Sequence, residues 1–483
     1  MKRRNFLKSM SLLGSTCMLP SLLQKQGFIS PAQASLSKRE LIHARALVLN
    51  EIGYVKPTVM PQIISIFLYG GPSELAGNLT NINEIDDNSQ NPYNSNMRRD
   101  ANNSVVTPNG FWGGAGGEVM ERMVGKGRLS VYRTIHRVKD DSKAHRPSIF
   151  SNLTGAIGVD DSRPGIATNL AAILAANNAI AEDALFPFVT FEGETVVFNQ
   201  GSLSVPLGLK PISLDKDLRN PYARSENSFL GESNSIIDSL AQNASQSSAS
   251  QFSKVIEAFK KRGEIEVFVN QLKDKLDNLT LPNDPDRATD DPAELSYPDN
   301  NFGNRLKAAV NLAINNPDSV FISLGSGGLG GWDDHDSALE KYSRRMRDLM
   351  LALEVAAKHL EVEGKGNVVI NVFGDFGRNV NLNNSMGWDH GNNQNLFTVG
   401  ASQSAGSNIP GRELGKIVGK TERIGKAKVN RQFTTPTADS YQCEPFSIAS
   451  SIYGYFGIQN PEKLTGEPPI DETAPNEWIN PDA

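Results

Sequence analysis

The chain has 483 residues, of which 39% are apolar and 21% charged, a composition that supports a large folded core and excludes general disorder. The formal net charge is −6 and no long basic run follows the N-terminus, which argues against nucleic acid or an anionic membrane surface as a partner. Beyond the N-terminus no run is long and apolar enough for us to expect a transmembrane segment in the mature protein.

Residues 1–34 are predicted to be an export signal and not part of the fold. They begin with basic residues, continue through a modestly apolar stretch and end at Ala32-Gln33-Ala34, which fits a small-x-small cleavage site. Arg3 and Arg4, followed by the sequence NFLK, resemble the signal read by the twin-arginine export machinery. An ordinary secretory signal is the alternative. Either signal predicts a periplasmic or secreted protein.

Six short runs after the signal are predicted to be strands. They are mostly apolar on both faces and bounded by glycine, which favours buried parallel strands. The runs span residues 63–69, 129–135, 186–191, 320–324, 367–373 and 395–399. Helical patterns lie between them, and the clearest consists of Leu339, Tyr342, Met346, Leu349, Leu353, Ala356 and Leu360. This alternation predicts an α/β fold with a doubly wound, mostly parallel sheet flanked by helices.

Two stretches interrupt the alternation of strands and helices. Residues 76–117 are rich in Asn and Gly and are predicted to form a long loop after the first strand. Residues 214–300 contain an amphipathic segment between polar, proline-containing edges, and we expect a helical insertion there. We therefore predict one domain over residues 35–483 with an insertion at about 214–300.

Two clusters of polar side chains follow the first two predicted strands. In doubly wound sheets ligands bind at the carboxyl ends of the strands, so these positions are candidates for a site. Glu74 follows the turn Gly70-Gly71, although a tight turn alone would explain the glycines. His145 and Arg146 then begin a predicted helix beside Ser148, where an anion could bind, unless this is only an exposed polar loop.

Two further clusters follow later strands. Asp333 and His335 lie in the sequence WDDHD just before the long helical pattern; helix capping explains one of the aspartates there, but hardly three with a histidine. Asp375 ends the next apolar run, and Arg378 lies three residues further on. Asp389 and His390 follow in a glycine-rich segment. Carboxylate and imidazole together suit a divalent metal ion.

These motifs together resemble the exported domain-of-unknown-function 1501 family, which is placed beside the alkaline phosphatases and sulfatases. The resemblance rests, in chain order, on RRNFLK, FLYGGPSE, AHRPSIFSNLTG, GGWDDHDSA, VFGDFGR with GWDHG, and PFSIASSIYGYFGI. It covers roughly residues 60–460 and implies an alkaline phosphatase/sulfatase-like fold. The family itself has no generally assigned activity.

The comparison with sulfatases implies roles for single residues. Their C/S-x-P-S-R sequence, followed five residues on by T-G, fits residues 145–148 and 154–155, so His145 stands where the nucleophile would be. His145 is therefore either a nucleophile or a metal ligand, Ser148 is a reserve nucleophile, and Arg146 or Arg378 could hold an anionic group. The candidate metal ligands are Glu74, Asp333, His335, Asp375, Asp389 and His390.

The resemblance departs from the superfamily at two metal positions. Phe376 stands where a histidine ligand would follow Asp375, and the first strand offers only Glu74. One divalent ion (Zn, Mn, Ca or Mg) held by Asp333, His335, Asp389 and His390 is the simpler arrangement. The sequence thus predicts an exported, metal-dependent hydrolase of phosphate or sulfate esters with a small anionic or ester substrate. The alternative is a non-catalytic exported protein for binding or surface assembly, with a degenerate site.

Overall fold

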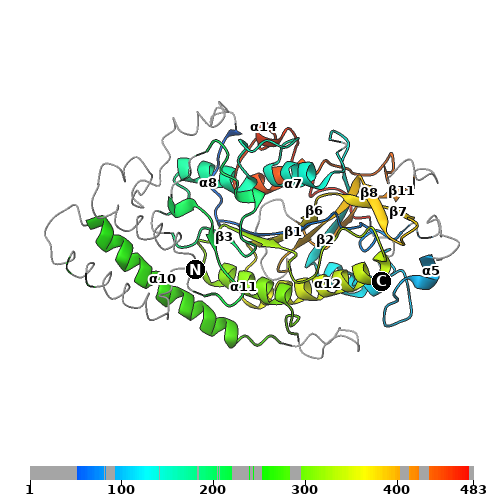
Figure 1. The fold of residues 1–483 in the computed structure, drawn as a ribbon, viewed down its shortest axis with the longest axis horizontal. Coiled ribbons are helices and arrows are strands. Elements are labelled where there is room, and N and C mark those ends of the chain that lie inside the picture. Colours follow the sequence, from blue (N-terminus) through cyan, green and yellow to red (C-terminus); the bar gives the residue numbers. More distant parts are fainter. Residues whose placement is uncertain are drawn as a thin grey trace, which may run out of the picture.

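Eight strands form the central sheet, in the order β10-β2-β9-β6-β1-β5-β3-β4 (Figure 1). The computed structural model describes residues 52–80, 82, 93–140, 142–181, 184–203, 205, 207–219, 239, 243, 253–282, 295–402, 413–423 and 435–477. The sheet strands are β1 (Gln62–Leu68), β2 (Leu129–His136), β3 (Phe188–Thr190), β4 (Ile212–Ser213), β5 (Phe321–Gly325), β6 (Val368–Gly374), β9 (Asn393–Val399) and β10 (Ile417–Val418). All six predicted strands are present.

The sheet is mixed but mostly parallel, which confirms the predicted fold class. β6, β1, β5, β3 and β4 run parallel, whereas β9 pairs antiparallel with both β2 and β6. An antiparallel strand reverses which end of its chain lies at a given edge of the sheet. The start of β9 therefore lies at the edge where β1, β2 and β6 end.

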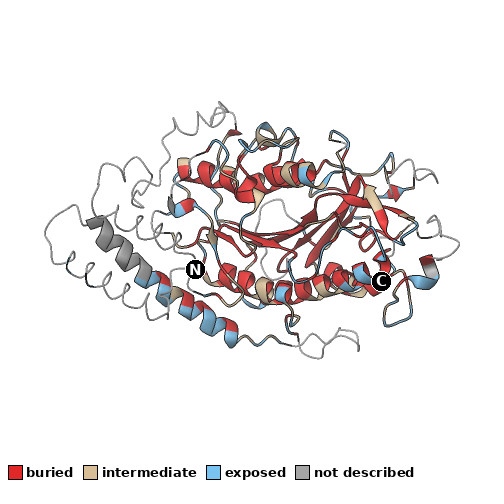
Figure 2. Cartoon of the chain, in the orientation of Figure 1, coloured by how far each residue is buried: buried red, intermediate tan, exposed pale blue. Residues whose placement is uncertain are grey.

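Helices cover both faces of the sheet, so the strands are buried on both sides (Figures 1 and 2). In β1, Ile64 and Ile66 belong to the hydrophobic core that includes α11 and α12. Ile63 and Phe67 belong to a second core, which includes α7, α8 and α13. The helices are α5 (Tyr93–Asn96), α6 (Gly117–Gly125), α7 (His145–Thr154), α8 (Ile166–Ala176), α10 (Ser253–Asp277), α11 (Asn301–Asn315), α12 (Ala338–Val362), α13 (Phe446–Tyr455) and α14 (Glu462–Thr465). Burial on two faces explains why the strands lack a polar alternation.

The predicted long helix is confirmed as α12. All seven apolar positions of the predicted pattern, from Leu339 to Leu360, are buried against the sheet side of this helix. The three- and four-residue spacing puts them on one stripe of the helix. α12 begins directly after the loop that carries Asp333 and His335, so its packing fixes that loop to the core.

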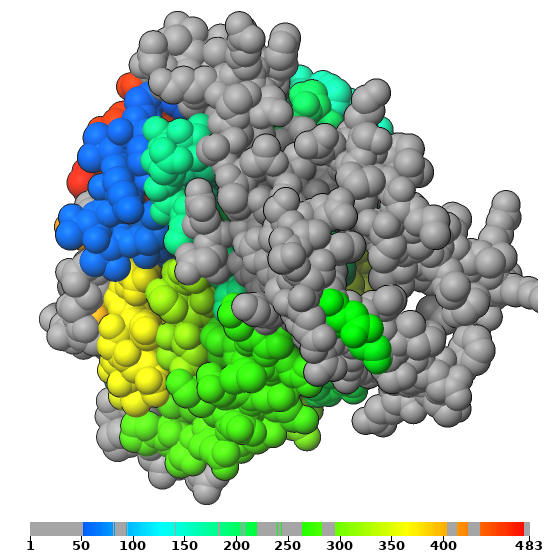
Figure 3. All heavy atoms as spheres, turned by 90° about the vertical axis from the view of Figure 1, so that its left-hand side faces the viewer, coloured from blue at the N-terminus to red at the C-terminus, as the bar shows by residue number. Residues whose placement is uncertain are grey.

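The two predicted interruptions differ in how much of them is described. Residues 93–116 are mostly irregular, with α5 and the short 3₁₀ helix η3 (Gly113–Ala115). Two more 3₁₀ helices, η4 (Val196–Phe198) and η5 (Leu207–Leu209), follow β3. Within residues 214–300 the main element is α10, which packs on α11 through a hydrogen bond from Asn311 to the Leu272 carbonyl oxygen (2.8 Å). Figure 3 shows α10 and α11 as neighbouring green atoms on one side of the molecule.

The predicted export signal, residues 1–34, lies outside the described residues. Among the residues that are described, no helix has both the length and the apolar character needed to cross a membrane.

Two small antiparallel pairs complete the structure. β7 (Gly377–Leu382) pairs with β8 (Trp388–Gly391), and β11 (Thr421–Glu422) pairs with β12 (Thr435–Pro436). The β7–β8 hairpin leaves the sheet directly after β6, at the edge where the carboxyl ends of the parallel strands lie (Figure 1). It therefore carries Arg378, Asp389 and His390 to the predicted site.

Candidate metal centre

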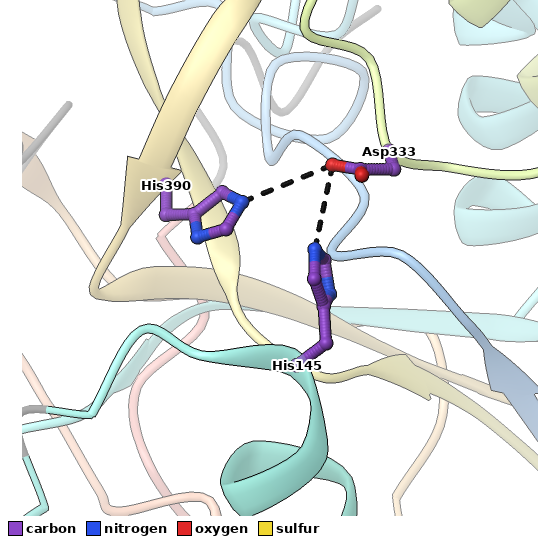
Figure 4. A group of neighbouring side chains, drawn as sticks. All are labelled: His145, Asp333 and His390. Atoms are coloured by element: carbon purple, nitrogen blue, oxygen red, sulfur yellow. Dashed lines mark ion pairs between the residues drawn. The ribbon is translucent and has the colours of Figure 1, made fainter.

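Three imidazoles and one carboxylate meet at this edge of the sheet, although they come from three separate segments. His145 begins α7, Asp333 and His335 lie in the loop between β5 and α12, and His390 lies in β8. Figure 4 shows His145 and His390 pointing toward Asp333 from two sides. Strand ends bring together residues that are up to 245 positions apart in the sequence.

The Nε2 atoms of the three histidines surround a single oxygen atom, Oδ1 of Asp333. That oxygen lies 3.1 Å from Nε2 of His335, 3.4 Å from Nε2 of His145 and 3.8 Å from Nε2 of His390. The Nε2 atoms of His335 and His390 are themselves 3.0 Å apart. The ligand atoms of His145, Asp333 and His390 all lie within 4.8 Å of one another.

The other ring nitrogen of each histidine faces a different acceptor. Nδ1 of His145 lies 2.7 Å from Oδ2 of Asp375, and Nδ1 of His335 lies 3.6 Å from Oδ1 of Asp389. Nδ1 of His390 meets the backbone carbonyl oxygen of Lys143. For His145 and His390 these contacts favour the tautomer with the proton on Nδ1, which leaves the Nε2 lone pair free for an ion, whereas the His335 contact is longer than a hydrogen bond.

These distances fit a tetrahedral divalent ion. With metal–nitrogen bonds of about 2.0–2.1 Å, two ligands of a tetrahedral ion lie roughly 3.3 Å apart. Four of the separations, from 3.0 to 3.8 Å, lie near that value, whereas the ligand atoms of His145, Asp333 and His390 as a group span up to 4.8 Å. The 3.0 Å contact between Nε2 of His335 and Nε2 of His390 requires either a proton on one of the two nitrogens or a cation between them.

The protonation states of Asp333 and His390 suit metal binding, whereas the hydrogen bond to Asp375 raises the pKa of His145. Burial acts to raise the pKa of Asp333, but the hydrogen bond and charge of Arg378, together with His335 and His145, hold that pKa below its usual value. Burial lowers the pKa of His390 to about 4, and the charges of neighbouring cations act in the same direction. Asp333 is therefore a carboxylate and His390 a neutral imidazole near pH 7, the forms that bind a metal.

Arg378 supplies a fixed positive charge beside these ligand atoms. Its side chain is fully buried, and its Nη2 lies 2.6 Å from Oδ1 of Asp333. Nη1 lies 3.4 Å from Nε2 of His335, and Nε donates to the Gly71 carbonyl oxygen (2.6 Å). Its N–H groups all have partners within the protein, so Arg378 contributes a fixed positive charge to the site and no free donor.

The β7–β8 hairpin and the loop before α12 are joined by backbone hydrogen bonds. The amide of Trp388 donates to the Asp334 carbonyl oxygen (2.8 Å), and that of Ala338 donates to the Met386 carbonyl oxygen (2.8 Å). A Cβ atom on Gly387 would collide with the backbone of His335. Glycine is therefore required where the hairpin crosses the loop, and the crossing sets the position of His335 relative to His390.

The aspartates of the loop do not cap the following helix. α12 has Ser337 at its N-cap with no side-chain capping hydrogen bond, and Asp336 instead pairs with Lys341 (2.7 Å). Asp334 is buried and pairs with Arg345. Only Asp333 of the three aspartates faces the histidines. Its side chain is 51% exposed, so the centre is open to solvent there.

Several predicted site residues lie around the ligand atoms and not among them. Asp375 and Asp389 contact Nδ1 of His145 and of His335, behind the rings. Glu74 is buried and its Oε2 accepts the backbone N–H of Arg378 (3.0 Å), and burial raises its pKa well above the usual value. The structure thus brings His145 into the ligand set in place of Asp389.

The predicted catalytic residues Ser148 and Arg146 lie apart from the ligand atoms. Ser148 is fully buried, and its hydroxyl donates to the Ser142 carbonyl oxygen (3.0 Å), so it is not presented to a substrate. Arg146 is exposed on the first turn of α7, with its guanidinium 5.8 Å from the centre of the Phe150 ring.

Sequence reasoning missed three supporting groups: the Lys143 carbonyl, Arg137 and Asn152. Arg137 and Asn152 both donate to the backbone carbonyl oxygen of Asp375, at 3.1 and 2.9 Å. A backbone acceptor can be supplied by any residue type, so Lys143 leaves no signal in the sequence. The unusual side chain is that of Arg137, a completely buried arginine directly after β2.

Comparison with known proteins places the chain in a family. The model of the family described as "Protein of unknown function (DUF1501)" matches residues 60–469. The chain belongs to this family. The resemblance predicted from the motifs is thereby confirmed. No curated protein matches the chain.

Several solved structures are distantly similar. The structure of Ps i-CgsB with k-i-k-neocarrahexaose is 11% identical, with a TM-score of 0.37, over 85% of this chain and 75% of that chain. The lipoteichoic acid synthase LtaP from Listeria monocytogenes is 10% identical, with a TM-score of 0.34, over 89% and 80%. The phosphonate monoester hydrolase SpPMH from Silicibacter pomeroyi is 12% identical, with a TM-score of 0.32, over 85% and 78%.

Proposed function

We propose that the chain is a metal-dependent hydrolase of phosphate or sulfate esters that acts after export. The observation that carries this proposal is the convergence of three Nε2 atoms on Oδ1 of Asp333, while each Nδ1 faces an acceptor behind its ring. A set of three imidazoles and one carboxylate suits zinc or manganese better than calcium or magnesium, which prefer oxygen ligands.

His145, Asp333, His335 and His390 would hold the ion. A divalent ion in such a site acidifies a bound water molecule or polarises an ester oxygen. The chain's own contribution is to orient His145 and His390 through their Nδ1 atoms and to hold Asp333 ionised beside Arg378. The open side at Asp333 admits a substrate.

Arg378 supports an anionic substrate. Its buried guanidinium is oriented by the carbonyl oxygens of Gly71 and Trp388 (2.6 and 2.8 Å), so its charge stays next to the ligand atoms. Phosphate and sulfate monoesters carry negative charge on the oxygens around the central atom, and a cation next to the ion stabilises the charge during ester cleavage. The match of residues 145–148 and 154–155 to the sulfatase sequence supports the same substrate class.

A metal assay combined with an ester assay tests this function. The purified protein, loaded with Zn²⁺ or Mn²⁺, is expected to hydrolyse p-nitrophenyl phosphate or p-nitrophenyl sulfate, and His335→Ala should lower both the metal content, by about 10-fold or more, and the rate. The control is Lys420→Gln, an exposed residue before β11 whose ammonium group pairs with Asp439 and Glu477 and with none of the candidate ligands. A metal-loaded protein that binds these esters without cleaving them would favour the binding or surface-assembly role, and a protein that retains no metal would overturn the proposal.

Export by the twin-arginine machinery is the second part of the proposal. It rests on Arg3 and Arg4 in the sequence RRNFLK and on the cleavage site at Ala32-Gln33-Ala34. Replacing both arginines by lysine should leave the precursor in the cytoplasm, because the receptor reads the arginine pair and not its charge alone. Cell fractionation of the wild type and the double variant measures this. Unchanged export of the variant would identify an ordinary secretory signal.

A further inference from the structure

We propose that Asp375, which the sequence presents as a metal ligand, is instead the positioning residue that fixes the tautomer of His145 and docks α7 beside the metal centre. The inference rests on the proposed metal site and adds a role for a residue that does not touch the ion. The evidence is the set of hydrogen bonds that the side chain and the backbone of Asp375 make.

The carboxylate of Asp375 is already fully engaged. Its side chain is completely buried, and Oδ2 lies 2.7 Å from Nδ1 of His145. The backbone N–H of Gly70 lies 3.1 Å from Oδ1 and 3.2 Å from Oδ2. A carboxylate held between a backbone donor and the back of an imidazole orients that imidazole, because its oxygens face Nδ1 and not the Nε2 side where the ion would bind.

The backbone of the same residue anchors the helix that carries His145. Asn152 donates to the carbonyl oxygens of Gly374 (2.7 Å) and Asp375 (2.9 Å). His145 and Asn152 are seven residues apart, close to two helical turns, so they lie on one face of α7. Residue 375 therefore holds α7 at both ends of this face, by its side chain at His145 and by its carbonyl at Asn152.

These contacts form a closed network that passes through Gly70, in the turn after β1. The N–H of Gly70 binds Asp375, while the carbonyl oxygen of Gly70 accepts from Arg378. Arg378 binds Asp333, which faces Nε2 of His145 at 3.4 Å. The side chains on the two sides of the centre are thus placed relative to each other through a single residue, Gly70, in the turn after β1.

The isosteric variant Asp375→Asn tests the tautomer role. If the Asn oxygen keeps the Gly70 N–H, the amide NH₂ must donate to Nδ1 of His145, which forces the ring proton onto Nε2, the ligand atom. The expected result is a 10- to 100-fold weaker affinity for Zn²⁺, measured by competition with a chelator, with a melting temperature of the metal-free protein close to that of wild type. Asp336→Asn is the control. It also removes one negative charge, but Asp336 pairs with Lys341 and not with a histidine, so the Zn²⁺ affinity should stay unchanged.

The tautomer is also measured directly on the metal-free protein. With ¹⁵N-labelled histidine at about pH 9, where imidazoles are neutral, His145 of the wild type should carry its proton on Nδ1 and that of Asp375→Asn on Nε2. An unchanged Zn²⁺ affinity in Asp375→Asn, or a wild-type His145 protonated on Nε2, would overturn the inference. Complete loss of metal, equal to that of His390→Ala, would make Asp375 a ligand and overturn it as well. None of these readouts depends on ester hydrolysis, so a protein without hydrolase activity would leave the inference standing.

Discussion

Two histidines with the same pKa lie in very different surroundings. His390 belongs to the candidate metal centre, and His359 lies near the end of α12, against Tyr297 of the segment before α11. Burial is the main cause that lowers the pKa of each to about 4. Nε2 of His390 meets His335 and faces Asp333, whereas Nδ1 of His359 meets the Tyr297 hydroxyl at 3.2 Å.

The comparison teaches that a lowered pKa marks burial and not function. His359 is 2% exposed and packs as a core residue that carries one hydrogen bond. His390 is one of several nitrogens that converge on one carboxylate, and its other nitrogen is oriented by the Lys143 carbonyl. The direction of the ring nitrogens distinguishes a ligand from a structural histidine, and the predictions below use that difference.

The largest expected effect separates the two histidines by metal content. His390→Ala should lower the Zn²⁺ affinity by at least about 100-fold with little change in the melting temperature of the metal-free protein, because it removes a candidate ligand in the β7–β8 hairpin, outside the two hydrophobic cores. His359→Ala should leave the metal-to-protein ratio unchanged but reduce the unfolding free energy by about 2–4 kcal/mol, the usual result of truncating a large buried side chain.

Elemental analysis and thermal melting of the same two samples measure both quantities. If His359→Ala lost metal as severely as His390→Ala, the distinction between the two regions would fail.

The second prediction compares a glycine at the candidate metal centre, Gly70, with a glycine after α12, Gly364. Gly70 has a φ of +117°, and a Cβ atom there would lie 2.6 Å from the backbone nitrogen of Asp333. Gly70→Ala should cost about 2–3 kcal/mol of unfolding free energy and also weaken metal binding, since Asp333 must move. Gly364 follows α12 with a φ of +63° and open space around its Cβ position, so Gly364→Ala should cost only about 1 kcal/mol and keep the metal. Urea denaturation and metal titration of both variants check this. Normal metal affinity in Gly70→Ala would show that Asp333 tolerates displacement.

A third prediction uses the acid sensitivity of His359. Its pKa of about 4 in the folded protein lies below the ordinary value of about 6.5, so as the pH falls the unfolded chain takes up the proton first. The stability is therefore complete above about pH 6.5 and declines between about pH 6.5 and 4, by up to about 1.4 kcal/mol per unit of pH from this group. His359→Leu removes this titration, so the metal-free variant should lose less stability than wild type over that window. Parallel curves of unfolding free energy against pH would contradict the assignment.

The smallest expected effect concerns Asp389. This carboxylate faces Nδ1 of His335, as Asp375 faces His145, but its side chain is 46% exposed and the distance is 3.6 Å. Water replaces an exposed acceptor easily, so Asp389→Asn should weaken Zn²⁺ binding only about 2- to 3-fold. Chelator competition beside Asp375→Asn measures the ratio. An equal loss in both variants would show that burial of the orienting carboxylate is unimportant.

The sequence by itself determined the positions of the main strands and of α12. Apolar runs such as residues 63–69 and 367–373 are buried whichever helices cover them, and the spacing from Leu339 to Leu360 fixes one stripe of α12. Asp333, His335 and His390 were recognisable because polar residues after buried strands collect at one edge of an α/β sheet. The direction of β9 and the two-residue strands β4 and β10 were not predicted, since an apolar run is the same for either direction and two residues carry no period.

Only the tertiary structure decided which side chains face the centre of the candidate site. Asp375, Asp389 and His390 all follow or lie in strands near one sheet edge, and their residue types suit a ligand equally well. The difference lies in which atom each one meets: Asp375 and Asp389 contact Nδ1 behind a ring, and His390 presents Nε2 in front. That orientation depends on the crossing of the β7–β8 hairpin over the loop before α12 and on the docking of α7 at residue 375. These are contacts between segments far apart in the chain, and no local pattern of residues records them.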